Sequence, residues 1–309
     1  MSAFTLLVGD ALERLRELPD DSVQTCVTSP PYWGLRDYGV EGQIGLESTP
    51  DEYVARLVRV FEEVRRVLKP DGTLWLNLGD SYANDGKWGG STGGKHAGGL
   101  HGNTNAGRGK KTTGLPPKNL IGIPWRVAFA LQAAGWTLRQ DIVWHKPNPM
   151  PAPVTDRCVS AHEYLFLLSK SERYHFDHVA IREPATGRSS GNGFDRAERV
   201  SLGGRGDPTP FEGVELRNKR SVWTVGTSPY RGAHFATFPP QLIEPCVLAG
   251  SRPGDIVLDP FAGTGTTGIV ALKEGRRFVG VELNPAYAEM AEQRSRSITP
   301  SLFLTKGAV

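Results

Sequence analysis

Short apolar runs alternate along the chain with segments in which apolar residues recur at helical spacing. The runs predict strands at Phe4–Val8, Val23–Thr28, Thr73–Leu78, Asp141–His145, Tyr164–Ser169, Ile256–Leu258 and Phe278–Val281. The helical spacing predicts helices at Ala11–Leu18, Asp51–Leu68, Ile123–Ala134 and Thr266–Glu274, with a turn at Lys69–Gly72. Such alternation is typical of an α/β protein with a largely parallel sheet.

Two stretches interrupt this pattern and divide the chain. Residues 82–118 are glycine-rich and hold six Lys or Arg against one Asp, so they cannot form a core and are expected to be a mobile loop. Residues 182–220 mix eight Lys or Arg with six Asp or Glu and lack clear periodicity. The expected core therefore comprises residues 1–81, 119–181 and 221–309.

Composition narrows the class of protein only slightly. A chain of 309 residues with 39% hydrophobic residues can bury a sizeable core, and its net charge of +3 permits contact with polyanions without demonstrating it. The three cysteines, Cys26, Cys158 and Cys246, are far apart and form no CxxC pair, so neither a disulfide framework nor a metal site is expected. No apolar run approaches the length that crosses a bilayer, which favours a cytoplasmic protein.

A glycine turn near the C-terminus carries the strongest local signal. Gly263, Gly265 and Gly268 follow a predicted strand and open a predicted helix, so they fit the GxGxxG pattern of an NAD site. However, Asp259 stands between the strand and the first glycine, where its carboxylate would repel a diphosphate. A cationic ligand reverses that argument, because a carboxylate attracts an ammonium or sulfonium group.

This turn resembles the motif with which amino-methyltransferases bind S-adenosylmethionine (AdoMet), written Asp-Pro-Phe-x-Gly-x-Gly-Thr-Thr. The matching residues are Asp259, Pro260, Phe261, Gly263, Gly265, Thr266 and Thr267. The resemblance implies that Phe261 packs near the adenine or the methionine, and that the two glycines permit close approach of the backbone. It also implies that Glu282, at the end of the next strand, binds the ribose hydroxyls, with Asn284 beside it.

A second motif, Ser29-Pro30-Pro31-Tyr32, follows a predicted strand and so lies at the carboxyl edge of the sheet, where α/β folds bind ligands. It resembles the catalytic motif of the same enzymes, Ser/Asp/Asn-Pro-Pro followed by an aromatic residue. A base amine is a poor nucleophile because its lone pair is delocalised into the ring. Two acceptors, the Ser29 hydroxyl and the Pro30 carbonyl, would favour the pyramidal amine, and Tyr32 would stack on a base flipped out of the duplex.

The first residue of that motif bears on the target base. Serine resembles the cytosine-N4 branch, whereas aspartate or asparagine is commoner in the adenine-N6 branch, so both bases stay open. A cytosine-C5 enzyme would need a cysteine nucleophile. Pro245-Cys246 fits superficially, but it lies in an apolar, helical stretch, and Cys246 is expected in the core.

The catalytic motif precedes the AdoMet motif, an order that resembles the beta class of amino-methyltransferases. The resemblance implies a circularly permuted Rossmann-like core with a mixed, mostly parallel sheet, in which the N-terminal strand follows a final helix. Asp10 then resembles the residue that contacts the AdoMet adenine amine, a role compatible with capping the helix that begins at Ala11. His234 is expected beside the AdoMet methionine.

Several residues are expected to face nucleic acid. Trp33 is expected to wall the base pocket, and the basic loop is expected to meet phosphates. Residues 182–220 look like a target-recognition segment between recognisable pieces of the core. The full set of expected nucleic-acid contacts is Trp33, Lys87, Lys95, Arg108, Lys110, Lys111, His145 and Lys146.

The sequence thus predicts a DNA methyltransferase that uses AdoMet to methylate the N4 amine of a flipped cytosine in double-stranded DNA. Three alternatives stay open: an adenine-N6 enzyme, an NAD-dependent oxidoreductase, and a DNA-binding protein that keeps the fold without activity. The resemblance also allows a cognate restriction endonuclease and a homodimer as partners.

Overall fold

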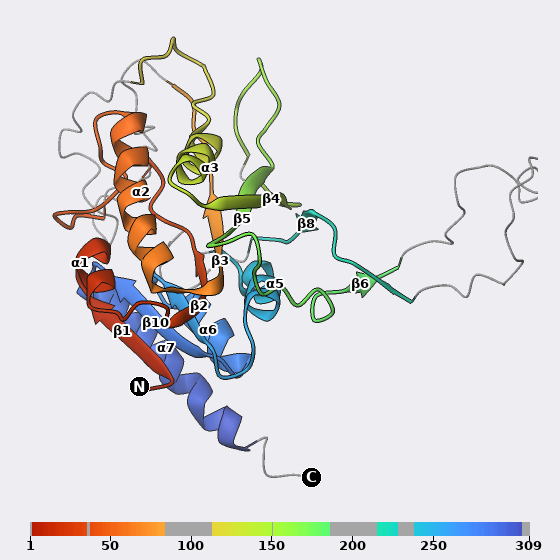
Figure 1. The fold of residues 1–309 in the computed structure, drawn as a ribbon. Helices are drawn as coiled ribbons and strands as arrows, with labels where there is room; N and C mark the ends of the chain where they lie inside the picture. Colours follow the sequence, from red (N-terminus) through yellow and green to blue (C-terminus); the bar gives the residue numbers. More distant parts are fainter. Residues whose placement is uncertain are drawn as a thin grey trace, which may run out of the picture.

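The computed structural model describes residues 2–35, 38–83, 113–149, 151–185, 215–227 and 238–304, with side chains described up to residue 297. Within them, eight strands form one mixed sheet in the order β1-β10-β9-β2-β3-β5-β4-β8 (Figure 1). Strands β3 and β4 are antiparallel to β5, and every other pair of neighbours is parallel. The strands are β1 (Phe4–Val8), β2 (Val23–Thr28), β3 (Leu68–Leu78), β4 (Thr137–His145), β5 (His162–Ser169), β8 (Val222–Thr224), β9 (Ile256–Asp259) and β10 (Arg277–Glu282).

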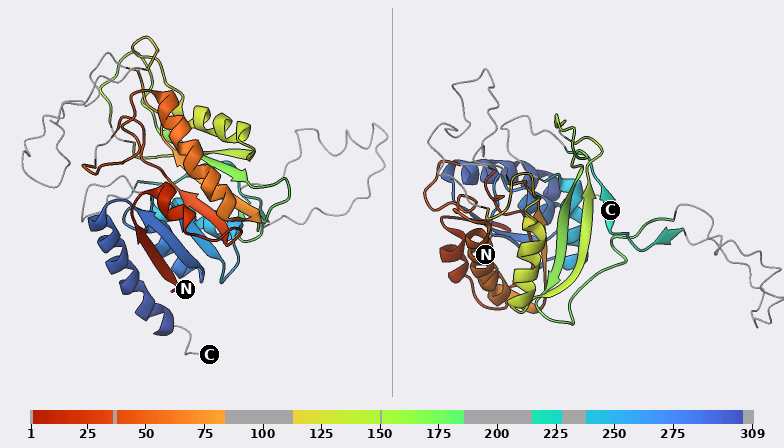
Figure 2. Two further views of the ribbon diagram at one scale, coloured as in Figure 1. Left: turned by 60° about the vertical axis from the view of Figure 1, so that its left-hand side comes forward. Right: turned by 90° about the horizontal axis from the view of Figure 1, so that it is seen from above.

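Helices cover both faces of this sheet (Figure 2). The side chains of β2 and β3 alternate between two cores, as expected for strands buried on both faces: Cys26 and Leu74 enter one, Val27 and Trp75 the other. The first core includes α1, α2 and α3, and the second includes α5 and α6. The described helices are α1 (Ala11–Arg16), α2 (Pro50–Val67), α3 (Ile123–Ala133), α5 (Pro240–Gly250), α6 (Thr266–Lys273) and α7 (Pro285–Leu304).

Local chemistry fixes where the helices begin. The Asp10 carboxylate accepts hydrogen bonds from the backbone N–H groups of Leu12 and Glu13, at 2.9 and 3.2 Å, so it caps α1 as expected. Thr49 caps α2 in the same way, and Pro50 occupies the first turn, where a missing N–H costs nothing.

The chain order of the sheet matches the expected circular permutation. Strand β1 pairs in parallel with β10, from Phe4 opposite Phe278 to Val8 opposite Glu282. Helix α7, which follows β10, packs against β1. The N-terminal strand therefore takes the place that would follow α7 in an uninterrupted βαβ unit.

Some boundaries differ from the sequence predictions. The turn expected at residues 69–72 lies inside β3, because Leu68 pairs with Val23 while Thr73 pairs with Thr25. Four residues on β3 thus oppose Gln24 alone, and the break in the pattern is an irregularity of register. Strand β4 begins at Thr137 rather than Asp141, because its first residues pair with β5 although they are partly exposed.

Residues 182–220 were expected to form a separate segment, and the structure describes only residues 182–185 and 215–220 of it. Strands β6 (Glu183–Pro184) and β7 (Leu216–Arg217) form a separate antiparallel pair, which lies away from the main sheet (Figure 1). The Glu183 carboxylate accepts from Arg217 and Arg220 at 3.0 and 2.6 Å and fastens this pair. Strand β8, just after it, joins the main sheet beside β4.

Candidate active site

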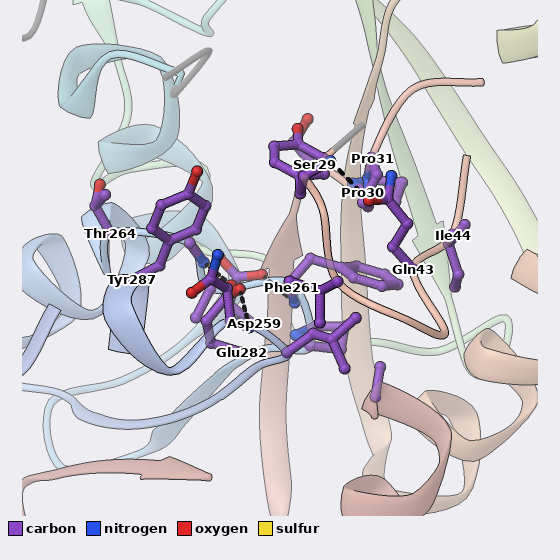
Figure 3. Close-up of a pocket in the computed structure, with 18 of the residues that line it drawn as sticks. Ser29, Pro30, Pro31, Gln43, Ile44, Asp259, Phe261, Thr264, Glu282 and Tyr287 are labelled. Carbon is purple, nitrogen blue, oxygen red and sulfur yellow. Dashed lines mark hydrogen bonds between the residues drawn. The ribbon is translucent and has the colours of Figure 1, made fainter. Parts of the chain in front are cut away.

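One pocket lies at the carboxyl ends of four parallel strands, β1, β10, β9 and β2 (Figure 3). Each strand delivers the turn that follows it to this edge, which is where open α/β sheets bind ligands. The glycine turn and the Ser-Pro-Pro-Tyr turn, about 230 residues apart in sequence, both line the pocket. The lining comprises residues 9–11, 29–32, 42–44, 259–264, 266–267 and 282–284, with Leu35, Tyr38, Val40, Phe238 and Tyr287.

Asp259 ends β9 and is buried at the floor of the pocket. Its carboxylate accepts hydrogen bonds from the Thr28 and Thr267 hydroxyls, at 2.6 and 2.7 Å, and from the Phe261 N–H at 3.0 Å. Burial outweighs these three bonds and raises the pKa of Asp259 to about 6. The carboxylate is therefore held in place by the protein and lacks a positive partner among the described residues.

Glu282 ends β10 on the same side of the pocket. One carboxylate oxygen accepts from the Gly263 N–H at 2.7 Å and the other from the Asn284 N–H at 2.8 Å. Burial raises the pKa of Glu282, and the charge of Asp259 adds to that rise. With Asp10 also in the lining, three acidic side chains surround one cavity.

The glycines of the turn have different structural roles. Gly263 lines the pocket with φ of +53°, and a methyl group there would meet nothing within 4 Å. Gly265 is the N-cap of α6 with φ of +77°, and an added Cβ would come within 2.8 Å of the Ala291 Cβ on α7. An added Cβ on Gly268 would clash with Phe4 and Phe278. Of these three glycines, Gly263 alone lines the pocket, while Gly265 and Gly268 allow close packing.

The Ser29-Pro30-Pro31-Tyr32 turn forms the opposite wall. The Pro31 carbonyl accepts from the Tyr53 hydroxyl at 2.9 Å, which fixes the turn against α2. The Tyr32 hydroxyl lies 2.7 Å from a carboxylate oxygen of Glu163 on β5. A Cβ on Gly79 would come within 2.6 Å of the Tyr32 ring, so glycine is required where the ring lies against the end of β3.

The residues expected to face nucleic acid lie in different places. Trp33 is 1% exposed, packs in the core and donates from its indole N–H to the Glu47 carbonyl at 3.0 Å, so we correct the expectation that it meets DNA. His145 is exposed at the end of β4, 3.1 Å from the Thr224 hydroxyl. Lys146 pairs with Glu163 and lies 4.3 Å from the centre of the Trp144 ring. Because Glu163 also contacts Tyr32, this pair places Lys146 near the Ser29-Pro30-Pro31-Tyr32 turn.

Other expected residues lie outside the part of the chain that the structure describes. These are Lys87, Lys95, Arg108, Lys110 and Lys111 of the basic loop, and His234. Cys246, by contrast, is described and lies fully buried within α5, where burial raises the pKa of its thiol. A buried thiol with that shift is unsuited to be a nucleophile, as expected.

Sequence reasoning missed one wall of the pocket and the partners of Tyr32. The missed wall comprises Leu35, Tyr38, Val40 and residues 42–44, and Tyr38 contacts Tyr287 of α7 edge to face, with ring centres 6.4 Å apart. Tyr287 follows Asn284 by three residues, and that spacing after a strand was a signal available in the sequence. Glu163 had one weaker signal, a charged residue near the start of an apolar strand.

Comparison with known proteins agrees with this geometry. The model of the N6_N4_Mtase family, described as DNA methylase, matches residues 23–293. The chain therefore belongs to this family of DNA methylases, which decides against an NAD-dependent oxidoreductase.

Among the described residues, none of the helices combines the length and the apolar character that a membrane span requires.

Several relatives cover almost the whole chain. The type II methyltransferase M.Cfr9I of Citrobacter freundii is 50% identical over 294 residues, which are 95% of this chain and 88% of the relative. M.SmaI of Serratia marcescens is 47% identical over 289 residues, 94% of this chain and 89% of the relative. The expected amino-methyltransferase family is thereby confirmed.

Solved structures confirm the fold. The PvuII DNA methyltransferase (cytosine-N4-specific) has a TM-score of 0.63 at 22% identity, over 94% of this chain and 87% of the other. A putative DNA modification methylase from Thermus thermophilus, complexed with S-adenosyl-L-methionine, has a TM-score of 0.58 at 27% identity, over 94% and 93%. The permuted α/β methyltransferase core expected from the sequence is thus present.

Proposed function

We propose that the protein transfers the methyl group of AdoMet to the N4 amine of a cytosine flipped out of double-stranded DNA. The observation that carries this proposal is the shared pocket, in which the Ser-Pro-Pro-Tyr turn faces the acidic glycine turn (Figure 3). A donor held on one wall and an amine held on the other would lie within reach of a single methyl transfer.

The acidic wall suits AdoMet better than a dinucleotide. Asp10, Asp259 and Glu282 line one cavity, and burial raises the pKa of Glu282, with the charge of Asp259 adding to that rise. A ligand with an ammonium and a sulfonium relieves this repulsion, whereas a diphosphate would increase it. AdoMet, when bound, supplies a methyl group already activated by positive sulfur. Gly263, with open space at its α-carbon, lets the ligand approach the backbone.

The opposite wall suits an amine. Ser29 offers a hydroxyl oxygen, and Pro30 offers a carbonyl whose direction the two prolines fix. Acceptors on both amine hydrogens would draw its lone pair out of the ring and toward the methyl group. Serine rather than aspartate at position 29 favours cytosine, and adenine N6 is the alternative acceptor.

Two further parts of the proposal concern DNA recognition. The β6–β7 pair projects from the core, which supports the assignment of residues 182–220 to target recognition. The type II names of the relatives favour a cognate restriction endonuclease, and a homodimer is a further expectation of the resemblance. Sequencing modified bases in DNA from expressing cells would report the recognition site.

The decisive experiment incubates the purified protein with duplex DNA and tritiated AdoMet, followed by nucleoside analysis. We expect label in N4-methylcytosine. Label in N6-methyladenine would replace cytosine by adenine in the proposal. DNA binding with no label in any base would support the inactive DNA-binding alternative.

A first variant tests the role of Ser29. Replacement Ser29→Ala removes an acceptor that acts on the amine, so we expect the rate of methyl transfer to fall roughly 100-fold. The Kd of AdoMet should stay within about twofold, because the donor is held by the other wall. Rapid-quench kinetics and calorimetry measure the two quantities. Equal losses of rate and AdoMet affinity would contradict the assigned role.

A further inference from the structure

A polar cluster lies behind the catalytic turn, where four strands of the sheet end or begin. Tyr32 follows β2, Asn77 lies near the end of β3, Lys146 follows β4, and Glu163 lies near the start of β5. Their side chains contact one another, and Ser29 reaches the cluster through Tyr32. The Glu163 side chain is 16% exposed and the Lys146 side chain 19%.

The contacts form a chain that begins in the pocket. The Ser29 hydroxyl lies 3.5 Å from the Tyr32 hydroxyl oxygen. That oxygen lies 2.7 Å from Glu163 Oε2 and 3.1 Å from Asn77 Oδ1. The other Glu163 oxygen, Oε1, pairs with the Lys146 ammonium.

This cluster contains one more hydrogen-bond acceptor than its protons can satisfy when Glu163 is ionised. The Asn77 amide nitrogen faces the Tyr164 carbonyl at 3.0 Å and Glu163 Oε2 at 3.3 Å, so its orientation is fixed and Asn77 Oδ1 points at Tyr32. Tyr32 has one hydroxyl proton but faces two acceptors. If Glu163 is ionised, Tyr32 donates to it, and Asn77 Oδ1 receives nothing from Tyr32.

Protonation of Glu163 completes the pattern. A neutral Glu163 donates from Oε2 to the Tyr32 oxygen, which frees the Tyr32 proton for Asn77 Oδ1. Lys146 keeps its hydrogen bond to Oε1 in either state. An added proton therefore gives every acceptor in the cluster a donor, while the pairing with Lys146 favours the ionised carboxylate when no proton arrives.

We propose that Glu163 is the final acceptor of the proton that the target amine loses, and that Ser29 and Tyr32 carry the proton to it. This inference rests on the proposed function. The amine nitrogen bonds to the methyl carbon as the sulfur–carbon bond breaks and its electron pair stays on sulfur. The nitrogen then gives a proton to the Ser29 oxygen, the Ser29 proton moves to the Tyr32 oxygen, and the Tyr32 proton moves to Glu163 Oε2.

The direction of the hydrogen bonds agrees with this path. Ser29 can accept from the amine only if its own proton points elsewhere, and the Tyr32 oxygen is its neighbour. Burial, with the charge of Glu163 next, raises the pKa of Tyr32 well above its usual range, so Tyr32 relays a proton without becoming a stable phenolate. The titratable groups that contact Glu163 among the described residues are Lys146 and Tyr32.

The test compares Glu163→Gln and Tyr32→Phe in single-turnover methylation of duplex DNA. Glutamine keeps the shape but cannot take up the proton, and phenylalanine keeps the stacking ring but breaks the relay. We expect each to lower the transfer rate roughly 100-fold, with the Kd of AdoMet and of DNA within about twofold. The double variant should be no slower than either single one, because both interrupt one path.

Asp255→Asn provides a matched control. Asp255 pairs with Lys69 at 2.9 Å and its side chain is 15% exposed, like that of Glu163, but it precedes β9 at the opposite edge of the sheet. The rate of methyl transfer by Asp255→Asn should stay within about twofold of the wild-type rate. Additive losses, or losses of AdoMet affinity instead of rate, would overturn the relay. A wild-type protein that methylates no base would overturn the proposed function instead.

Discussion

At the scale of single residues, the buried carboxylate of Asp259 makes the stability of the protein depend on pH. Burial raises its pKa to about 6, against an ordinary value of 3.8, although three hydrogen bonds favour the ionised form. Between about pH 4 and pH 6 the folded protein therefore holds a proton that the unfolded chain has lost. The contribution of Asp259 to stability is fullest below about pH 4 and is lost as pH rises through 6.

AdoMet affinity should show the opposite trend. A cationic ligand prefers the ionised Asp259, so we expect affinity to fall by up to about tenfold per pH unit below pH 6. Calorimetry between about pH 5 and pH 7.5 measures this slope. Asp259→Asn should bind AdoMet more weakly at about pH 7.5 and lose much of the slope. A wild-type affinity that does not change with pH would rule out the assigned role.

At the scale of elements, two glycines in the turn between β9 and α6 have different surroundings. Gly265 packs against α7, whereas Gly263 lines the pocket. Gly265→Ala places a methyl group 2.8 Å from Ala291 at a φ of +77°, so we expect the free energy of unfolding to fall by roughly 2–4 kcal/mol. Gly263→Ala meets no neighbour at φ of +53° and should cost only about 1–2 kcal/mol, but its methyl group enters the pocket. In urea unfolding, Gly265→Ala should lose more stability than Gly263→Ala. In calorimetry, Gly263→Ala should lose more AdoMet affinity than Gly265→Ala. If one variant showed the larger loss in both measurements, the two glycines would not have these separate roles.

The same scale shows what the sequence could predict. The ends of β2 and β10 were predicted within a residue, because an apolar run followed by proline or by an acidic turn marks them locally. Strand β8 was missed, since three residues carry too little periodicity and its pairing with β4 depends on distant residues. Glu163 was missed for the same reason: it meets Tyr32 across 131 positions of sequence. The two motifs thus located two walls of the pocket. The residues behind these walls, such as Glu163, are determined by contacts between strands, which the sequence does not reveal locally.

At the scale of the whole molecule, β2 lies between two halves of the sheet, one formed by β1, β10 and β9 and the other by β3, β5, β4 and β8. Two buried hydroxyls cross this junction. Thr28 of β2 donates to Asp259 of β9 at 2.6 Å, and Thr267 of α6 lies 3.3 Å from the Val27 carbonyl. Each contact joins residues more than 200 positions apart in sequence, so these contacts close long loops and depend on the complete fold.

Thr28→Val tests this junction. Valine keeps the shape but removes the donor to a buried carboxylate, and a hydrogen bond to a charged group contributes roughly 1.5–3 kcal/mol. We expect a loss of that size at about pH 7.5, where Asp259 is ionised, and a smaller loss at about pH 5, where it is largely neutral. The sign follows because the Thr28 bond lowers the pKa of Asp259, so its removal harms the ionised form most. Thr28→Ser, which keeps the hydroxyl, is the control in urea unfolding at both values of pH. Losses that are equal at the two values would mean that Thr28 acts by packing, and that its bond to Asp259 does not stabilise the junction between the halves.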